Sequence, residues 1–81
     1  MKVLISDDEH HVIQAIRLLV PWEEFGIDQI YTASNGMEAL DIITREVPEI
    51  VITDIVMEDK NGIDIMDFIA TRHPSIKVIA V

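Results

Sequence analysis

The fold is decided by Lys2–Asp8, KVLISDD, an apolar run of strand-forming residues that ends in two adjacent carboxylates. A second run of the same kind, Ile50–Asp54, IVITD, also ends in a carboxylate. Short β-branched runs without polar alternation are typical of strands that are covered on both faces. We therefore expect buried strands over Lys2–Ser6 and Ile50–Thr53, each followed directly by aspartate.

The segments around these strands alternate between helical and extended patterns. A helix is predicted from about Glu9 to Val20, with Asp8 as its N-cap and its end marked by Pro21 and Gly26. Its apolar residues recur at helical spacing and predict a stripe that faces a core, formed by Val12, Ile13, Ile16, Leu19 and Val20.

The rest of the chain continues this alternation. Strands are predicted over Ile27–Ala33 and Ile76–Val81, and Glu58–Gly62 is expected to be a polar loop. After the turn or cap Ser34-Asn35-Gly36, a helix that ends near Pro48 should direct these residues to the core: Met37, Leu40, Ile42 and Ile43. A last helix, which ends before Pro74, carries a stripe of Ile63, Met66 and Ile69.

The resulting order, βαβαβαβ, predicts an α/β fold with a parallel sheet and helices on its faces. Its doubly wound topology is either Rossmann-like or flavodoxin-like. In the flavodoxin-like order the first and third strands are neighbours, and ligands bind at the carboxyl ends of strands near that point. Asp7, Asp8 and Asp54 would then converge in one cleft.

Three converging carboxylates suggest a site for a divalent cation. Like charges this close repel each other, and Mg²⁺ relieves the repulsion because it binds through carboxylates, waters and phosphate oxygens. One carboxylate could also act as a nucleophile toward phosphorus. A simpler explanation is that Asp7 and Asp8 cap the first helix and Asp54 caps a turn, but the shared position at strand ends favours the metal site.

Composition narrows the class of protein. The 81 residues carry a formal net charge of −9, so DNA or RNA binding through this segment is not expected. The chain has no cysteine, which excludes disulfides and thiolate metal sites. It also lacks an apolar run near the roughly 20 residues of a membrane span. These features favour a cytoplasmic protein that makes no contact with membranes.

The order of the motifs resembles the receiver domain of bacterial two-component response regulators. The acidic signature after the first strand matches at Asp7-Asp8-Glu9, and Val51–Met57 resembles the phosphoacceptor segment. Asn61-Gly62 stands where receivers place a turn before their third helix, and Asn35–Leu40 resembles the start of their second helix. Trp22 and Gly26 resemble receivers that are joined to AraC-type DNA-binding domains.

The resemblance implies a fold, a site and a partner. The fold is a flavodoxin-like sheet of strand order 2-1-3-4, and Asp54 accepts a phosphoryl group from a sensor histidine kinase. Mg²⁺ is held directly by Asp8 and Asp54, by Asp7 mainly through water, and by the backbone carbonyl of Val56. The domain is a regulatory phosphoacceptor, not an enzyme, and it acts on transcription through an effector domain outside this chain, which alone would contact DNA.

Two departures from the family pattern stand out. Glu58 occupies a position where receivers usually have proline, which should reshape the loop and add a negative charge. The resemblance also covers only the N-terminal portion of a receiver over residues 1–81: the Ser or Thr after the fourth strand and the Lys after the fifth are absent. The fourth strand would then be an apolar edge, and we expect either a homodimer through pairing of this strand or partial unfolding.

Other functions fit the sequence less well. Phosphatases of the haloacid-dehalogenase kind need Asp-x-Asp on one strand, whereas Val56 follows two residues after Asp54. Dinucleotide-binding enzymes need G-x-G-x-x-G after the first strand, where this chain has Ser6-Asp7-Asp8. The alternative that stays open is a phosphorylation-independent interaction module on a receiver fold. His10 and His11 are expected to be exposed helix residues.

Overall fold

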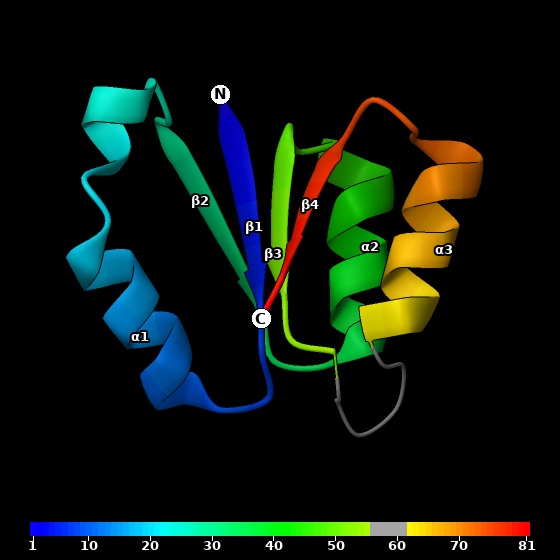
Figure 1. Ribbon diagram of the computed structural model, residues 1–81, viewed down its shortest axis with the longest axis horizontal. Coiled ribbons are helices and arrows are strands. Elements are labelled where there is room, and N and C mark those ends of the chain that lie inside the picture. Colours follow the sequence, from blue (N-terminus) through cyan, green and yellow to red (C-terminus); the bar gives the residue numbers. More distant parts are fainter. Residues whose placement is uncertain (56–61) are drawn as a thin grey trace.

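The computed structural model describes residues 1–55 and 62–81, which form a parallel sheet with helices on both faces (Figure 1). The strands lie in the order β2-β1-β3-β4, as the resemblance implied. In chain order the elements are β1 (Lys2–Ser6), α1 (His10–Leu19), the 3-10 helix η1 (Trp22–Phe25), β2 (Gln29–Ala33), α2 (Gly36–Glu46), β3 (Ile50–Thr53), α3 (Gly62–Arg72) and β4 (Lys77–Ala80).

Strand β1 lies between β2 and β3, and its side chains are buried on both faces of the sheet. Val3, Leu4 and Ile5 are each at most 1% exposed. Successive side chains of a strand point to opposite faces. Leu4 joins the core beneath α2 and α3, whereas Val3 and Ile5 do not belong to that cluster. Figure 1 shows α1 on the other side of the sheet from α2 and α3.

The main core lies between the sheet and the pair α2 and α3. Its buried members are aliphatic and come from β1, β2, α2, β3, α3 and the connection that precedes β4. They are Leu4, Ala33, Ala39, Ile42, Ile43, Val51, Ile65, Ile69 and Ile76.

Helix α1 corrects two predictions. Asp8 is not its N-cap: Glu9 holds that position without a side-chain cap hydrogen bond. The stripe is also shorter than predicted, because Ile13 is buried but Leu19 is 80% exposed. Periodicity identifies the residues on one face of a helix but not how far the neighbouring sheet extends beneath it. The last turn of α1 is contacted instead by Trp22, whose Nε1 donates to the Arg17 carbonyl at 3.0 Å.

The buried faces of α2 and α3 differ from the predicted stripes by part of a turn. Met37 and Ile63, both expected in the core, are 58% and 59% exposed. Ala39 and Ile65, which were not expected there, are each 0% exposed. The reason on α2 is that Ala39, Ile42 and Ile43 lie three and four residues apart and share a face that Met37 does not join. On α3, Ile65 and Ile69 define the face in the same way.

The connections refine the predicted boundaries. Asn35 caps α2, since its side chain accepts a hydrogen bond from the Glu38 amide at 2.8 Å. Strands β2 and β4 are shorter than predicted, and η1 was not predicted. Gly26 follows η1 with φ 74°, a left-handed conformation that glycine adopts without strain. Residues 58–61 of the predicted polar loop lie outside the described residues, and Gly62 begins α3.

Candidate metal centre

The backbone brings the ends of β1 and β3 to the same edge of the sheet. The two strands pair in parallel, with Ser6 opposite Thr53. The ladder continues one residue further, because the Asp54 amide donates to the Ser6 carbonyl at 2.9 Å. The Asp7 amide likewise donates to the Ala33 carbonyl of β2 at 3.0 Å. Both aspartates are therefore fixed by the sheet itself at its carboxyl edge.

Asp7, Asp8 and Asp54 converge as the sequence predicted. One carboxylate oxygen from each can be chosen so that all three lie within 4.8 Å of one another. Asp7 is 6% exposed, Asp54 is half-buried and Asp8 is exposed. Among the residues that the structure describes, this carboxylate triad is the only group of three or more acidic, histidine or cysteine side chains with such spacing.

Asp7 has a structural role in addition to its place in the triad. Its Oδ1 accepts a hydrogen bond from the backbone amide of Glu9 at 2.9 Å. This contact orders the turn between β1 and α1 and orients the Asp7 carboxylate. The sequence predicts that Asp8 organises the start of α1, but Asp7 is the aspartate that makes this contact.

Gly62 positions the other half of the site. At the start of α3 its amide donates to the Ile55 carbonyl at 2.6 Å. A Cβ at Gly62 would lie 2.7 Å from the Ile55 Cα and 3.0 Å from the Asp54 carbonyl carbon, and would also clash with the Asp54 carbonyl oxygen. Only a residue without a side chain lets α3 approach the Asp54 backbone this closely. The Asn61-Gly62 motif in the sequence predicts a turn but does not predict this contact.

Two hydroxyl residues next to the triad were missed by the sequence reasoning. Ser6 and Thr53 are 1% and 0% exposed, and the Thr53 Oγ1 donates to the Asp54 carbonyl at 3.0 Å. Their signal in the sequence was weak, because a polar residue at the end of an apolar strand is also an ordinary strand terminus. Here the Thr53 hydroxyl restrains the peptide that carries Asp54.

The donor set of the triad fits a hard divalent cation. Three carboxylates provide only oxygen ligands, which Mg²⁺ prefers, and the exposed side of the cleft leaves room for the waters that it retains. Val56, whose carbonyl was expected to be a further ligand, lies outside the described residues, as does Glu58. His10 and His11 are exposed as predicted, and His11 Nε2 lies 3.2 Å from a Glu9 carboxylate oxygen.

A doubly wound parallel sheet of strand order 2-1-3-4 with an acidic cluster at its switch point belongs to the flavodoxin-like class of folds, in which ligands bind at the carboxyl ends of the strands. Comparison with known families agrees with this class: the family model described as "Response regulator receiver domain" matches residues 3–81. The chain therefore belongs to the response regulator receiver domain family. As such it is a regulatory domain of two-component systems and not an enzyme.

Curated relatives include staphylococcal regulators. The transcriptional regulatory protein HptR of Staphylococcus aureus is 45% identical over 79 residues, which cover 98% of this chain and 31% of that protein. An uncharacterized response regulatory protein of Staphylococcus epidermidis is 48% identical over 66 residues, covering 82% of this chain and 26% of that protein. The chain thus spans less than a third of the curated relatives that it matches.

Solved structures share the fold closely. A two-component transcriptional regulator AraC from Clostridium phytofermentans superposes with a TM-score of 0.93 at 30% identity, covering 99% of this chain and 62% of that one. The receiver domain of AraT from Geobacillus stearothermophilus gives a TM-score of 0.92 at 30% identity, with coverages of 98% and 61%.

Across the described part of this chain, no helix combines the length and apolar character needed to cross a membrane.

Proposed function

We propose that this chain is a phosphoacceptor receiver in which Asp54 takes a phosphoryl group from a sensor histidine kinase. Mg²⁺ would be held by Asp7, Asp8, Asp54 and the backbone carbonyl of Val56. The observation that carries the proposal is the carboxylate triad, whose oxygens lie within 4.8 Å of one another at the carboxyl edge of the sheet. Family membership over residues 3–81 supports the same assignment.

The chemistry follows from the nucleophile and its surroundings. A carboxylate oxygen of Asp54 attacks the phosphorus of a phosphohistidine, the P–O bond forms and the P–N bond breaks. The electron pair leaves with the imidazole, which takes up a proton from solvent. When bound, Mg²⁺ neutralises negative charge on the transferring group. Asp7 contributes through its fixed carboxylate, and the hydrogen bonds of Ser6 and Thr53 hold the Asp54 backbone in place.

The output of the domain is proposed to be regulation of transcription. An aspartyl phosphate adds about −1.5 to −2 charge, by analogy with other phosphorylated side chains, and an effector outside this chain would read that change. A structural relative described as an AraC transcriptional regulator supports an AraC-type DNA-binding effector. Residues 1–81 would be the N-terminal portion of the receiver, in a cytoplasmic protein whose DNA contacts lie elsewhere.

A small-molecule phosphodonor tests the proposed acceptor directly. The 81-residue chain is incubated with acetyl phosphate and Mg²⁺, and intact mass is followed by peptide mapping. We expect a gain of one phosphoryl group on Asp54, lost in Asp54→Asn and in the presence of a chelator. Asp67→Asn, an exposed carboxylate of α3 outside the triad, provides the matched control and should label like the parent.

Two outcomes would contradict the proposal. Labelling that persists in Asp54→Asn would place the acceptor elsewhere. If the parent is not labelled either with or without Mg²⁺, the result would favour the phosphorylation-independent interaction module.

A further inference from the structure

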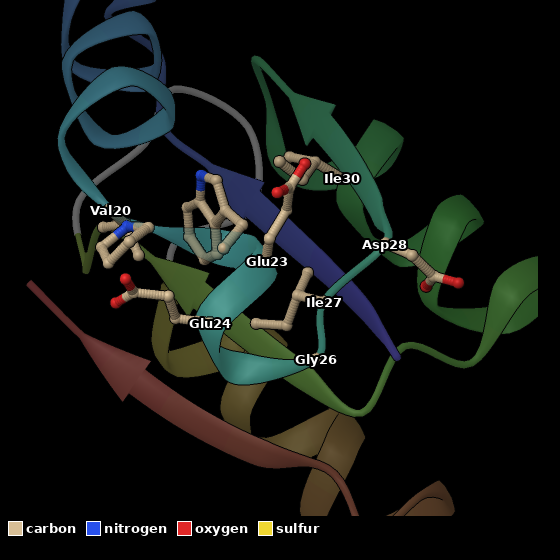
Figure 2. A pocket seen from close by; sticks show the side chains of 9 residues that line it. Val20, Glu23, Glu24, Gly26, Ile27, Asp28 and Ile30 are labelled. Atoms are coloured by element: carbon tan, nitrogen blue, oxygen red, sulfur yellow. The ribbon is translucent and has the colours of Figure 1, made fainter.

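Residues of η1 and of the segments before and after it line an open pocket of about 770 Å³ at the amino-terminal end of the sheet (Figure 2). We call it the η1 pocket. Its apolar walls are formed by Val20, Pro21, Trp22, Ile27 and Ile30. It lies near Met1, whereas the carboxylate triad follows the other end of β1, which spans on the order of 15 Å. The η1 pocket is therefore a separate site.

The walls of the η1 pocket are held by hydrogen bonds within the chain. The Trp22 Nε1 donates to the Arg17 carbonyl at 3.0 Å, so the polar group of the indole is satisfied internally. The Ile27 amide donates to the Trp22 carbonyl at 3.1 Å, and the amino group of Met1 donates to the Gly26 carbonyl at 3.2 Å. A pocket that is ordered before binding avoids much of the entropic cost of forming an interface.

The polar residues of the η1 pocket are all acidic. Glu23, Glu24 and Asp28 line it, and none of the basic residues in the described part of the chain does. Asp28 is paired with the amino group of Met1 at 2.9 Å, which holds the pKa of its carboxyl below the usual range. No ion pair of Glu23 or Glu24 is found among the described residues. These two carboxylates thus leave the pocket with uncompensated negative charge.

The arrangement of these carboxylates does not suit a metal ion. In Figure 2 the side chains of Glu23, Glu24 and Asp28 extend in different directions around Ile27. Within the described part of the chain, the only acidic group with metal-ligand spacing is the carboxylate triad. The carboxylates of the η1 pocket are spread around its apolar walls. This arrangement instead complements a long side chain that is apolar along its length and carries a positive charge at its end.

We propose that the η1 pocket binds a peptide segment of a partner protein that carries arginine beside an aliphatic residue. The aliphatic residue and the methylene groups of arginine would lie against the apolar walls. The guanidinium would pair with Glu23 or Glu24, because its planar fork matches a carboxylate, and would gain from the face of the Trp22 ring. This interaction is independent of phosphorylation at Asp54.

The single tryptophan of the chain reports on this pocket without labelling. The probe is a capped hexapeptide of alternating leucine and arginine, titrated into the 81-residue chain while Trp22 fluorescence is recorded. We expect a saturable change in the emission of Trp22. Replacing arginine by glutamine in the peptide should weaken binding at least about threefold, as should raising the salt concentration.

Matched variants locate the interaction. Glu23→Gln and Glu24→Gln should each lower the affinity by about two- to fivefold, the range of an exposed ion pair. Asp67→Asn removes the same charge on α3 and should leave the affinity unchanged. The proposal is overturned if Trp22 does not respond, if the glutamine peptide binds as tightly, or if Asp67→Asn weakens binding as much as Glu23→Gln.

Discussion

Gly62→Ala is the substitution that best tests how the fold positions the candidate site. The added Cβ would lie 2.7 Å from the Ile55 Cα and 3.0 Å from the Asp54 carbonyl carbon. These neighbours are backbone atoms, so no side-chain rotation can relieve the contact. Relief requires α3 to move away from β3, which would also shift the peptide that carries Asp54.

The expected magnitude follows from two opposing effects. Overpacking against fixed atoms costs about 1–3 kcal/mol. Alanine is favoured over glycine within helices by up to about 1 kcal/mol, but less at the first residue of a helix such as Gly62. The free energy of unfolding should therefore fall by about 1–2 kcal/mol. The assay is urea unfolding followed by far-UV circular dichroism, with Mg²⁺ affinity measured by calorimetry on the same samples.

Gly26→Ala provides the control for this experiment. Within residues 1–55 and 62–81, no atom from outside the neighbouring residues lies within 4 Å of a Cβ at Gly26, but its φ of 74° is unfavourable for alanine. It should cost about 1–2 kcal/mol of stability and leave Mg²⁺ affinity unchanged, since Gly26 is remote from the triad. Gly62→Ala should lower both quantities. A Gly62→Ala protein with parental stability and parental Mg²⁺ affinity would refute the account of this contact.

Two further predictions concern charge and packing. Hydrogen bonds from Tyr31 and then Lys2 hold the pKa of Glu46 below its usual range, so its contribution to stability is present above the unfolded pKa of about 4.3 and is lost as pH falls through the lower folded pKa. Glu46→Gln should flatten the acid side of a stability–pH curve, and a slope unchanged from the parent would contradict this linkage. On α3, Ile65→Ala should cost about 2–5 kcal/mol because Ile65 is fully buried. Ile63→Ala should change stability by less than about 0.5 kcal/mol. If thermal melts showed that the two variants lose the same stability, the assignment of Ile65 to the buried face of α3 would be wrong.

The order of elements and the position of the site were predictable because they depend on short-range patterns. Buried strands followed directly by aspartate are visible in the sequence, and the parallel sheet then brings their ends together. The strand order itself came from the family resemblance, since periodicity does not distinguish doubly wound topologies. Predicting that Asp7, Asp8 and Asp54 converge therefore required both the local sequence pattern and the family resemblance.

The details that were not predictable depend on contacts between distant residues. Whether Met37 or Ala39 enters the core depends on the rotation of α2 against the sheet. Which aspartate orders the start of α1 depends on the turn geometry after β1, where Asp7 Oδ1 accepts from the Glu9 amide. The need for glycine at position 62 arises from the approach of α3 to β3, which no local pattern reveals.

The central claim is that Asp54 is a metal-dependent phosphoacceptor within the carboxylate triad. Beryllofluoride binding to the 81-residue chain, measured by fluorine NMR with and without Mg²⁺, tests it most directly, since this anion mimics an acyl phosphate on a carboxylate. The account predicts a bound signal that requires Mg²⁺ and disappears in Asp54→Asn while it persists in Asp67→Asn. A bound signal that survives in Asp54→Asn, or no signal from the parent at saturating Mg²⁺, would contradict the account.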